Sequence, residues 1–223
     1  MGLRSNVWWL MTNLRFAFLI PLLMSASSCA TTVHSVTAPV AHPSTQYRVG
    51  DFVVYSYTGE ALPQPVELQE EIVQRDGLRL HIQVEARRGS QVRRWVQVVT
   101  DTPENQANNV IDELHELIGS ERRRLANKDN RDAYRLYEWT FPPSFKGRGE
   151  PTPFSHTVSI EARPMSADCQ RRPVAVGETP AIMENCTSPA FLWTHVFGRL
   201  YRESDNTTPW QVSVESSGPG RTR

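Results

Sequence analysis

The sequence predicts a mainly β (α+β) fold, in which an antiparallel curved sheet or a sandwich carries one inserted amphipathic helix. Apolar and polar residues alternate over residues 78–87, as expected for a strand with one buried face. The dipeptide Asp76-Gly77 separates this segment from a second strand-like segment, 66–75, and favours a tight hairpin turn. Over residues 103–126 the period of the apolar residues changes to that of a helix.

Four strands are expected before this helix. Segment 47–57 is dense in β-branched and aromatic residues, which suit a pleated surface. Segments 66–75, 78–87 and 92–100 follow as an antiparallel meander, with a second turn at Arg88-Gly89-Ser90.

The helix is predicted to begin just after Asp101-Thr102, because a capping side chain followed by Pro103 and Glu104 is typical of a first helical turn. The apolar stripe of this helix comprises Ala107, Val110, Ile111, Leu114, Leu117, Ile118 and Leu125. The run Arg122-Arg123-Arg124 lies near the expected C-terminus, where positive charge suits the helix dipole, and is interpreted as a solvated face, with a binding patch as the less favoured alternative.

The last third of the chain is expected to be mostly β. An ordered segment at 134–141 precedes a loop rich in Pro and Gly at 142–153, and strands are predicted at 154–163, 190–203 and 208–215. A single β-rich domain, residues 47–216, is the expectation at this length, and residues 217–223 are expected to form a disordered tail.

The N-terminal segment has the parts of an export signal. Arg4 and Arg15 precede the apolar run 16–24, and the small residues 25–28 lead to Cys29. The run is too short for a stable membrane span, which needs about 20 apolar residues. Either Met1 or Met11 can serve as the start of such a signal.

The sequence Ala26-Ser27-Ser28-Cys29 resembles the lipobox of bacterial lipoproteins, although Ala26 stands where leucine is usual. The resemblance implies removal of the signal peptide, residues 1–28, and lipidation of Cys29, with residues 29–46 as a flexible tether. It also implies a membrane partner, and Ala30 after the cysteine favours the outer membrane facing the periplasm. The alternative is an ordinary signal peptide that is cleaved near Ala30 and takes Cys29 with it.

Two further cysteines, Cys169 and Cys186, form an even pair, which in an exported protein predicts a disulfide. Such a link stabilises by about 3 kcal/mol in the chain-entropy model. The segment between them contains Pro173, Gly177 and Pro180 and is expected to be irregular.

Composition and motifs argue against several functions. The 24 basic and 24 acidic side chains balance, so nucleic acid is not an expected partner. No G-x-S-x-G, phosphate-loop or Rossmann pattern occurs. His115-Glu116 begins like a helical zinc motif, but Gly119 occupies the place of the second histidine. The sequence therefore predicts a protein without enzyme activity, metal or cofactor.

A candidate ligand-lining set comes from polar and aromatic residues on strand faces that also carry apolar residues. Glu70 shares a face with Leu68 and Ile72, and His156 shares one with Val158 and Ile160. The remaining members follow the alternation of one strand: Phe191, Trp193, His195, Phe197 and Tyr201. They either converge on a pocket or are ordinary core and edge residues.

Two functions fit these observations. The first is an envelope lipoprotein whose domain is a non-enzymatic binding module for an envelope protein or component. The alternative is a carrier or sensor that holds a lipid-like, apolar ligand between sheet and helix. The expected architecture is similar to the lipoprotein-carrier and lipid-binding lipoprotein families of bacterial envelopes, although no sequence motif of those families is present. A hydrolase is the least favoured, because no nucleophile-base pair is visible.

Overall fold

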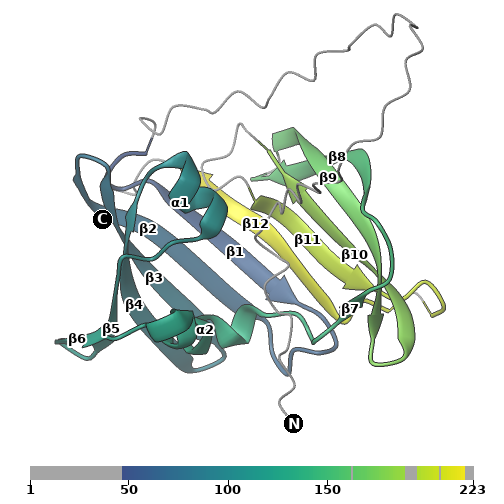
Figure 1. Ribbon diagram of the computed structural model, residues 1–223, viewed down its shortest axis with the longest axis horizontal. Helices are drawn as coiled ribbons and strands as arrows, with labels where there is room; N and C mark the ends of the chain where they lie inside the picture. The colour runs from purple at the N-terminus through teal and green to yellow at the C-terminus, as the bar shows by residue number, and fades with distance from the viewer. Residues whose placement is uncertain (1–46, 162, 189–194, 206, 219–223) are drawn as a thin grey trace, which may run out of the picture.

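The computed structural model describes residues 47–161, 163–188, 195–205 and 207–218, and the statements below refer to these residues. They form a 12-stranded antiparallel sheet whose order is β6-β5-β4-β3-β2-β1-β12-β11-β10-β9-β7, with β8 paired to β9 as well (Figure 1). The prediction of a mainly β fold is confirmed, and of its two alternatives the structure adopts a single curved sheet rather than a sandwich.

The first four strands lie where the sequence predicts them. They are β1 (Phe52–Thr58), β2 (Val66–Asp76), β3 (Arg79–Arg88) and β4 (Gln91–Thr100). Apolar residues of these strands alternate into one face, which includes Tyr55, Leu68, Val84 and Trp95. Because the helical residues 131–140 pack on this face, we call it the covered face, and we call the opposite side the outer face.

Four hairpins of the sheet share one turn chemistry. Each has a two-residue loop whose first residue is a glycine with positive φ, and the residues before and after the loop are paired. The loops are Gly77-Leu78, Gly89-Ser90, Gly119-Ser120 and Gly177-Glu178, and the glycine φ values are 62, 57, 60 and 60°. Glycine at the first loop position is the preference of type II′ hairpin turns. The turn expected at Asp76-Gly77 is therefore shifted by one residue.

The long helix predicted over residues 103–126 is wrong. A helix does begin at Pro103, where the Thr102 hydroxyl accepts the Asn105 N–H (3.2 Å), but α1 spans only Pro103–Asn108. It ends because Asn109 adopts a left-handed φ of 50°, and the Val110 N–H then bonds the Asn105 carbonyl (3.0 Å) in the manner of a Schellman cap.

The rest of the predicted helix is a β-hairpin of β5 (Glu113–Ile118) and β6 (Glu121–Leu125). Leu114 is fully buried and pairs with Leu125 across the hairpin, so part of the apparent helical stripe comes from cross-strand neighbours. The arginine run lies on the edge strand rather than at a helix C-terminus.

A segment that we call the strap runs from residue 128 to residue 149, from the β6 side of the covered face to the β9 side (Figure 1). It contains η3 (Lys128–Asn130), α2 (Arg131–Tyr137), η4 (Glu138–Thr140) and β7 (Lys146–Gly147). Ala133, Leu136 and Trp139 of the strap belong to the same buried core as Trp95 and Val84 of the sheet. The strap is thus packed onto the sheet by its own apolar residues.

The remaining strands are β8 (Thr152–Ile160), β9 (Arg163–Val176), β10 (Thr179–Thr187), β11 (His195–Tyr201) and β12 (Trp210–Gly218). Two expectations fail here. The segment between the cysteines is the β9–β10 hairpin rather than an irregular loop. The expected disordered tail starts too early, because Ser217 and Gly218 pair with Val53 and Phe52 of β1. Residues 219–223 lie outside the described residues.

The predicted disulfide is present. Cys169 and Cys186 are directly opposed in the β9–β10 register, with sulfur atoms 2.03 Å apart. Both side chains are buried. Close by, β8 contacts β12 although β9, β10 and β11 separate these strands in the sheet order, so the sheet folds back on itself at this end.

Candidate functional site

Glu70 lies in β2 on the covered face, as its position in the alternation predicts, and is 7% exposed. The Tyr137 hydroxyl, at the end of α2, donates to its Oε1 atom (2.9 Å) and lies 3.1 Å from Oε1 of Gln97 in β4. A phenol has only one proton, so the second contact is a hydrogen bond when the Gln97 amide turns its Nε2 group toward Tyr137. The hydrogen bond to this buried carboxylate therefore comes from a neutral hydroxyl.

Aromatic residues surround Glu70. Burial, and next the nearby charge of Glu70, raise the pKa values of Tyr55, Tyr57 and Tyr137 well above their usual range. Their hydroxyls therefore keep their protons at neutral pH. The ring of Trp95 meets the ring of Tyr137 edge to face, with centroids 4.8 Å apart. Packed aromatic rings thus occupy the space around Glu70.

The strap is fastened to the sheet by further contacts. The Trp210 indole N–H donates to the Thr140 carbonyl (3.0 Å). The Arg93 guanidinium contacts Glu138 (2.7 Å) and stacks on the Trp139 ring at 3.9 Å from its centroid. Together with the Tyr137 hydrogen bond, these contacts hold the strap against the covered face.

A second buried glutamate lies on the outer face at the other end of the sheet. Glu184 of β10 has a side chain that is 3% exposed, and it accepts from Arg171 of β9 (2.7 Å) and from Arg199 of β11 (2.6 Å). Burial alone would raise the pKa of Glu184, but the hydrogen bonds from Arg199 and Arg171 outweigh it and hold the pKa below its ordinary value. The Tyr201 hydroxyl lies 3.4 Å from Oε1 of Glu184.

Each of the two arginines that bind Glu184 also lies over an aromatic ring. Arg171 lies over the Phe154 ring (5.1 Å to the centroid), and Arg199 lies over the Tyr201 ring (4.5 Å). Both arginine side chains are 39–49% exposed, so their remaining N–H groups face water. The arrangement neutralises a buried carboxylate and presents guanidinium groups on an aromatic background.

The structure divides the predicted ligand-lining set. His156 and Phe197 come together, with ring centroids 6.1 Å apart, and Tyr201 joins the Glu184 cluster of the same half of the sheet. Glu70 belongs to the other half, under the strap. His195 is the first residue of β11, but its side chain lies outside the described residues, as do Phe191 and Trp193.

Sequence reasoning missed Arg171, Glu184 and Arg199. Glu184 and Arg171 fall in the segment that was expected to be irregular. The signal that could have identified them is Gly177, which marks a hairpin, and counting outward from its loop pairs Glu184 with Arg171.

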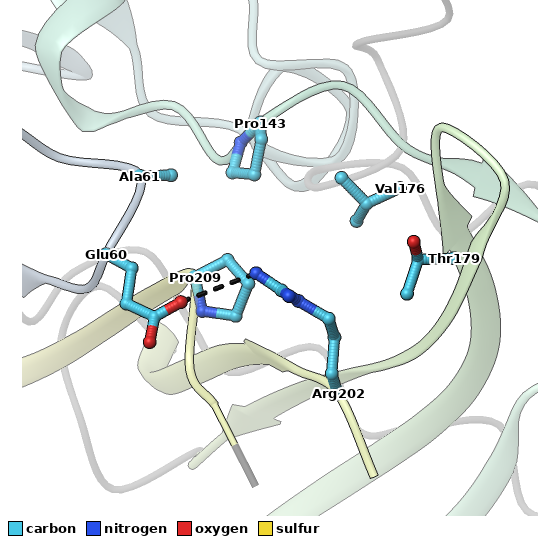
Figure 2. Close-up of a pocket in the computed structure, with 7 residues that line it drawn as sticks. All are labelled: Glu60, Ala61, Pro143, Val176, Thr179, Arg202 and Pro209. Atoms are coloured by element: carbon cyan, nitrogen blue, oxygen red, sulfur yellow. Dashed lines mark hydrogen bonds and ion pairs between the residues drawn. The ribbon is translucent and has the colours of Figure 1, made fainter. Parts of the chain in front are cut away.

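Two shallow concavities are formed at the end of the sheet where the β9–β10 turn lies. The larger, of about 440 Å³, is bordered by the Glu60–Arg202 ion pair (3.4 Å) and by Pro143 of the strap (Figure 2). The smaller, of about 320 Å³, lies beside Pro173, Pro180 and Ile182. Neither is lined by the residues predicted from the sequence.

Within the described residues, no cluster of three or more His, Cys, Asp or Glu side chains is arranged to hold a metal ion. Across the same residues, no helix is both long and apolar enough to span a membrane.

Comparisons with known proteins add a resemblance of shape alone. No family model matches the chain. The search of curated proteins found no match. Among solved structures, the chain is similar to a hypothetical protein of Chlamydia trachomatis, with 11% identity, a TM-score of 0.44, and coverage of 79% of this chain and 90% of that one. It is also similar to a Bacteroides fragilis protein with a YmcC-like fold, named as a candidate exported protein, with 9% identity, a TM-score of 0.36, and coverage of 77% and 96%.

Proposed function

We propose that this protein is a membrane-anchored lipoprotein of the bacterial envelope whose β-rich domain is a non-enzymatic binding module. The N-terminal signal and Cys29 support the anchor, and the Cys169–Cys186 disulfide is in keeping with an oxidising compartment. The outer membrane, facing the periplasm, is the proposed location.

The packing under the strap is the observation that favours a binding module over a carrier. A carrier needs an apolar cavity of several hundred Å³ that encloses most of its ligand. Here Leu136 and Trp139 of the strap are buried against the sheet, and Tyr137 reaches down to Glu70. The binding function is therefore assigned to the surface of the domain.

The anchor is tested by growing cells with an alkyne-labelled fatty acid. The wild-type protein should incorporate the label and Cys29→Ser should not, because the thioether and amide sites of lipidation are both lost. The double variant Cys169→Ser/Cys186→Ser keeps Cys29 and should still be labelled. Equal labelling of the wild type and Cys29→Ser would contradict lipidation at this residue.

The choice between module and carrier is tested by native mass spectrometry of the Cys29→Ser protein, which has no acyl chains of its own. The expected mass is that of the polypeptide with one disulfide. Added mass that solvent extracts as an apolar molecule would overturn the binding-module proposal and favour the carrier.

A further inference from the structure

The strand β6 is one edge of the sheet. It pairs with β5 on one side, and the strand order of the described residues places no strand on its other side (Figure 1). An open edge presents backbone N–H and C=O groups that can pair with another extended chain. The question is which kind of chain this edge accepts.

The hairpin register shows which residues direct their backbone outward. Ile118 and Glu121 flank the two-residue loop, and such a closing pair exchanges both of its hydrogen bonds. Because pairs alternate from there, Arg123 also bonds toward β5, whereas Arg122 and Arg124 direct their N–H and C=O groups to the open edge. These two residues therefore provide four backbone groups for an added strand.

The side chains of the same two residues supply the charge. Directly paired residues lie on the same face of a sheet, and Arg122 is paired with Leu117, which is itself paired with Arg94. Arg94 precedes Trp95, whose side chain is on the covered face, so Arg94 and Arg122 lie on the outer face. Arg124, two residues further along the strand, lies on the outer face as well. Both are exposed, and among the described residues neither forms a direct ion pair, although Arg124 is near enough to Glu113 to help Arg79 lower the pKa of that carboxyl. Arg123, on the other face, is bound by Glu116.

Two of the three carboxylates closest to this edge are already occupied, and the third, Glu121 of β6, shares the face of Arg123 rather than that of Arg122 and Arg124. Glu113 is held by Arg79 (2.7 Å) and His115 (3.2 Å), and Glu116 by Arg123 and Arg135. Lys128 and Arg131 at the start of the strap are also exposed, but they lie off the edge strand and alternate with Asp129 and Asp132. The protein as a whole is neutral, so this edge is a local excess of positive charge.

A second copy of this chain is a poor occupant of the edge. Antiparallel pairing of β6 with itself would place arginines opposite arginines, and directly opposed like charges are destabilising. Charged residues on edge strands are a known protection against such self-association. The same charges favour a partner strand with carboxylates at the matching positions.

We propose that β6 is a docking edge for an extended acidic segment of another envelope protein, which adds to the sheet as an antiparallel strand. Its recognition element is a pair of Asp or Glu residues at positions i and i+2, opposite Arg122 and Arg124. This inference rests on the proposed function as a binding module and adds the kind of partner to it.

The test uses the full-length protein in detergent and a fluorescent peptide with the core Thr-Glu-Thr-Glu-Thr, with binding measured by anisotropy. The charge-reversal variant Arg122→Glu/Arg124→Glu should bind about tenfold more weakly, because two attractive cross-strand charge pairs become repulsive. The matched control Lys128→Glu/Arg131→Glu makes the same charge change off the edge and should bind within about twofold of the wild type. Circular dichroism and the thermal midpoint check that both variants are folded.

A second peptide separates strand pairing from simple attraction of charges. It has the same sequence but carries N-methyl groups on the two glutamates, whose N–H groups would donate to Arg122 and Arg124. Strand addition predicts that this peptide does not bind. Equal binding of both peptides, equal loss in both charge-reversal variants, or no binding of the first peptide would each overturn the proposal. Fatty-acid labelling at Cys29 does not depend on this result, so failure here is distinguishable from failure of the anchor.

Discussion

The domain buries two glutamates in opposite ways. Glu70 lies between the sheet and the strap and accepts from the Tyr137 hydroxyl, which in turn lies beside the Gln97 amide. Glu184 lies on the outer face and meets two arginines. The first accepts from a neutral hydroxyl and the second from charged guanidinium groups, although both carboxylates are almost completely removed from water.

The difference follows from the depth of each site. An arginine beside Glu70 would have to bury its own charge under the strap, which costs several kcal/mol per ion. Arg171 and Arg199 can compensate Glu184 because their guanidinium groups remain partly in water. A glutamate buried between the sheet and the strap is therefore bonded by a neutral group. A glutamate covered only by side chains of the sheet surface can be bonded by arginines that reach water.

The largest effect that would test this contrast is alkaline unfolding. Tyr55, Tyr57 and Tyr137 have raised pKa values in the folded protein, whereas tyrosines of the unfolded chain ionise near pH ~10. Their contribution to stability is therefore intact below pH ~10 and lost as the pH rises above it, by about 1.4 kcal/mol per tyrosine per pH unit. The free energy of unfolding should fall by about 4 kcal/mol between about pH 9 and 11. Urea titrations measure this, and an unchanged midpoint would contradict the raised pKa values of these tyrosines.

A smaller effect is expected from removing one hydroxyl in each region. Tyr137→Phe removes one hydrogen-bond donor to Glu70 in a buried site and should destabilise by about 2 kcal/mol. The matched change Tyr201→Phe should cost less than about 0.5 kcal/mol, because Glu184 keeps both arginines. Thermal or urea unfolding of the two variants gives the comparison, and equal losses would mean that the two glutamates do not differ in this way.

The smallest expected effect is on the acid side. The pKa of Glu184 is lowered in the folded protein, so its contribution to stability is present above the unfolded value of about 4.3 and lost as the pH falls through the folded value. Glu184→Gln should lower the free energy of unfolding by about 1 kcal/mol at pH 7, and the difference from the wild type should shrink as the pH falls below the unfolded value of about 4.3. The control Glu67→Gln, at an exposed position of β2, should show no such convergence.

Local chemistry made half of the fold predictable. The strands β2, β3 and β4 follow from alternation and from turns that contain glycine. Glycine marks a hairpin turn at Gly119 and Gly177 as well. The helix-like spacing of apolar residues hid the turn at Gly119, and the prolines at 173 and 180 hid the turn at Gly177. In the hairpin β5–β6, residues such as Leu114 and Leu125 are neighbours across strands, and sequence spacing alone cannot distinguish them from neighbours on a helix.

The candidate site was predictable only in part. Alternation placed Glu70 correctly in a buried row, and Phe197 and His156 do lie together. His156 and Phe197 come together because the sheet folds back so that β8 approaches β12. The same folding leaves Glu70 in the other half of the sheet. Contacts of this kind join strands that are not neighbours in the sheet, so no local pattern records them.

By itself, the sequence determined the β-rich class, the strands of the first meander, the start of α1 and the pairing of Cys169 with Cys186, because each depends on residues close in the chain or on a single possible partner. Only the tertiary structure decided the path of the strap, the hydrogen-bond partners of the two glutamates and the open, arginine-bearing edge at β6. These features depend on which strands become neighbours and which face is covered, and burial of apolar surface over the whole sheet sets both.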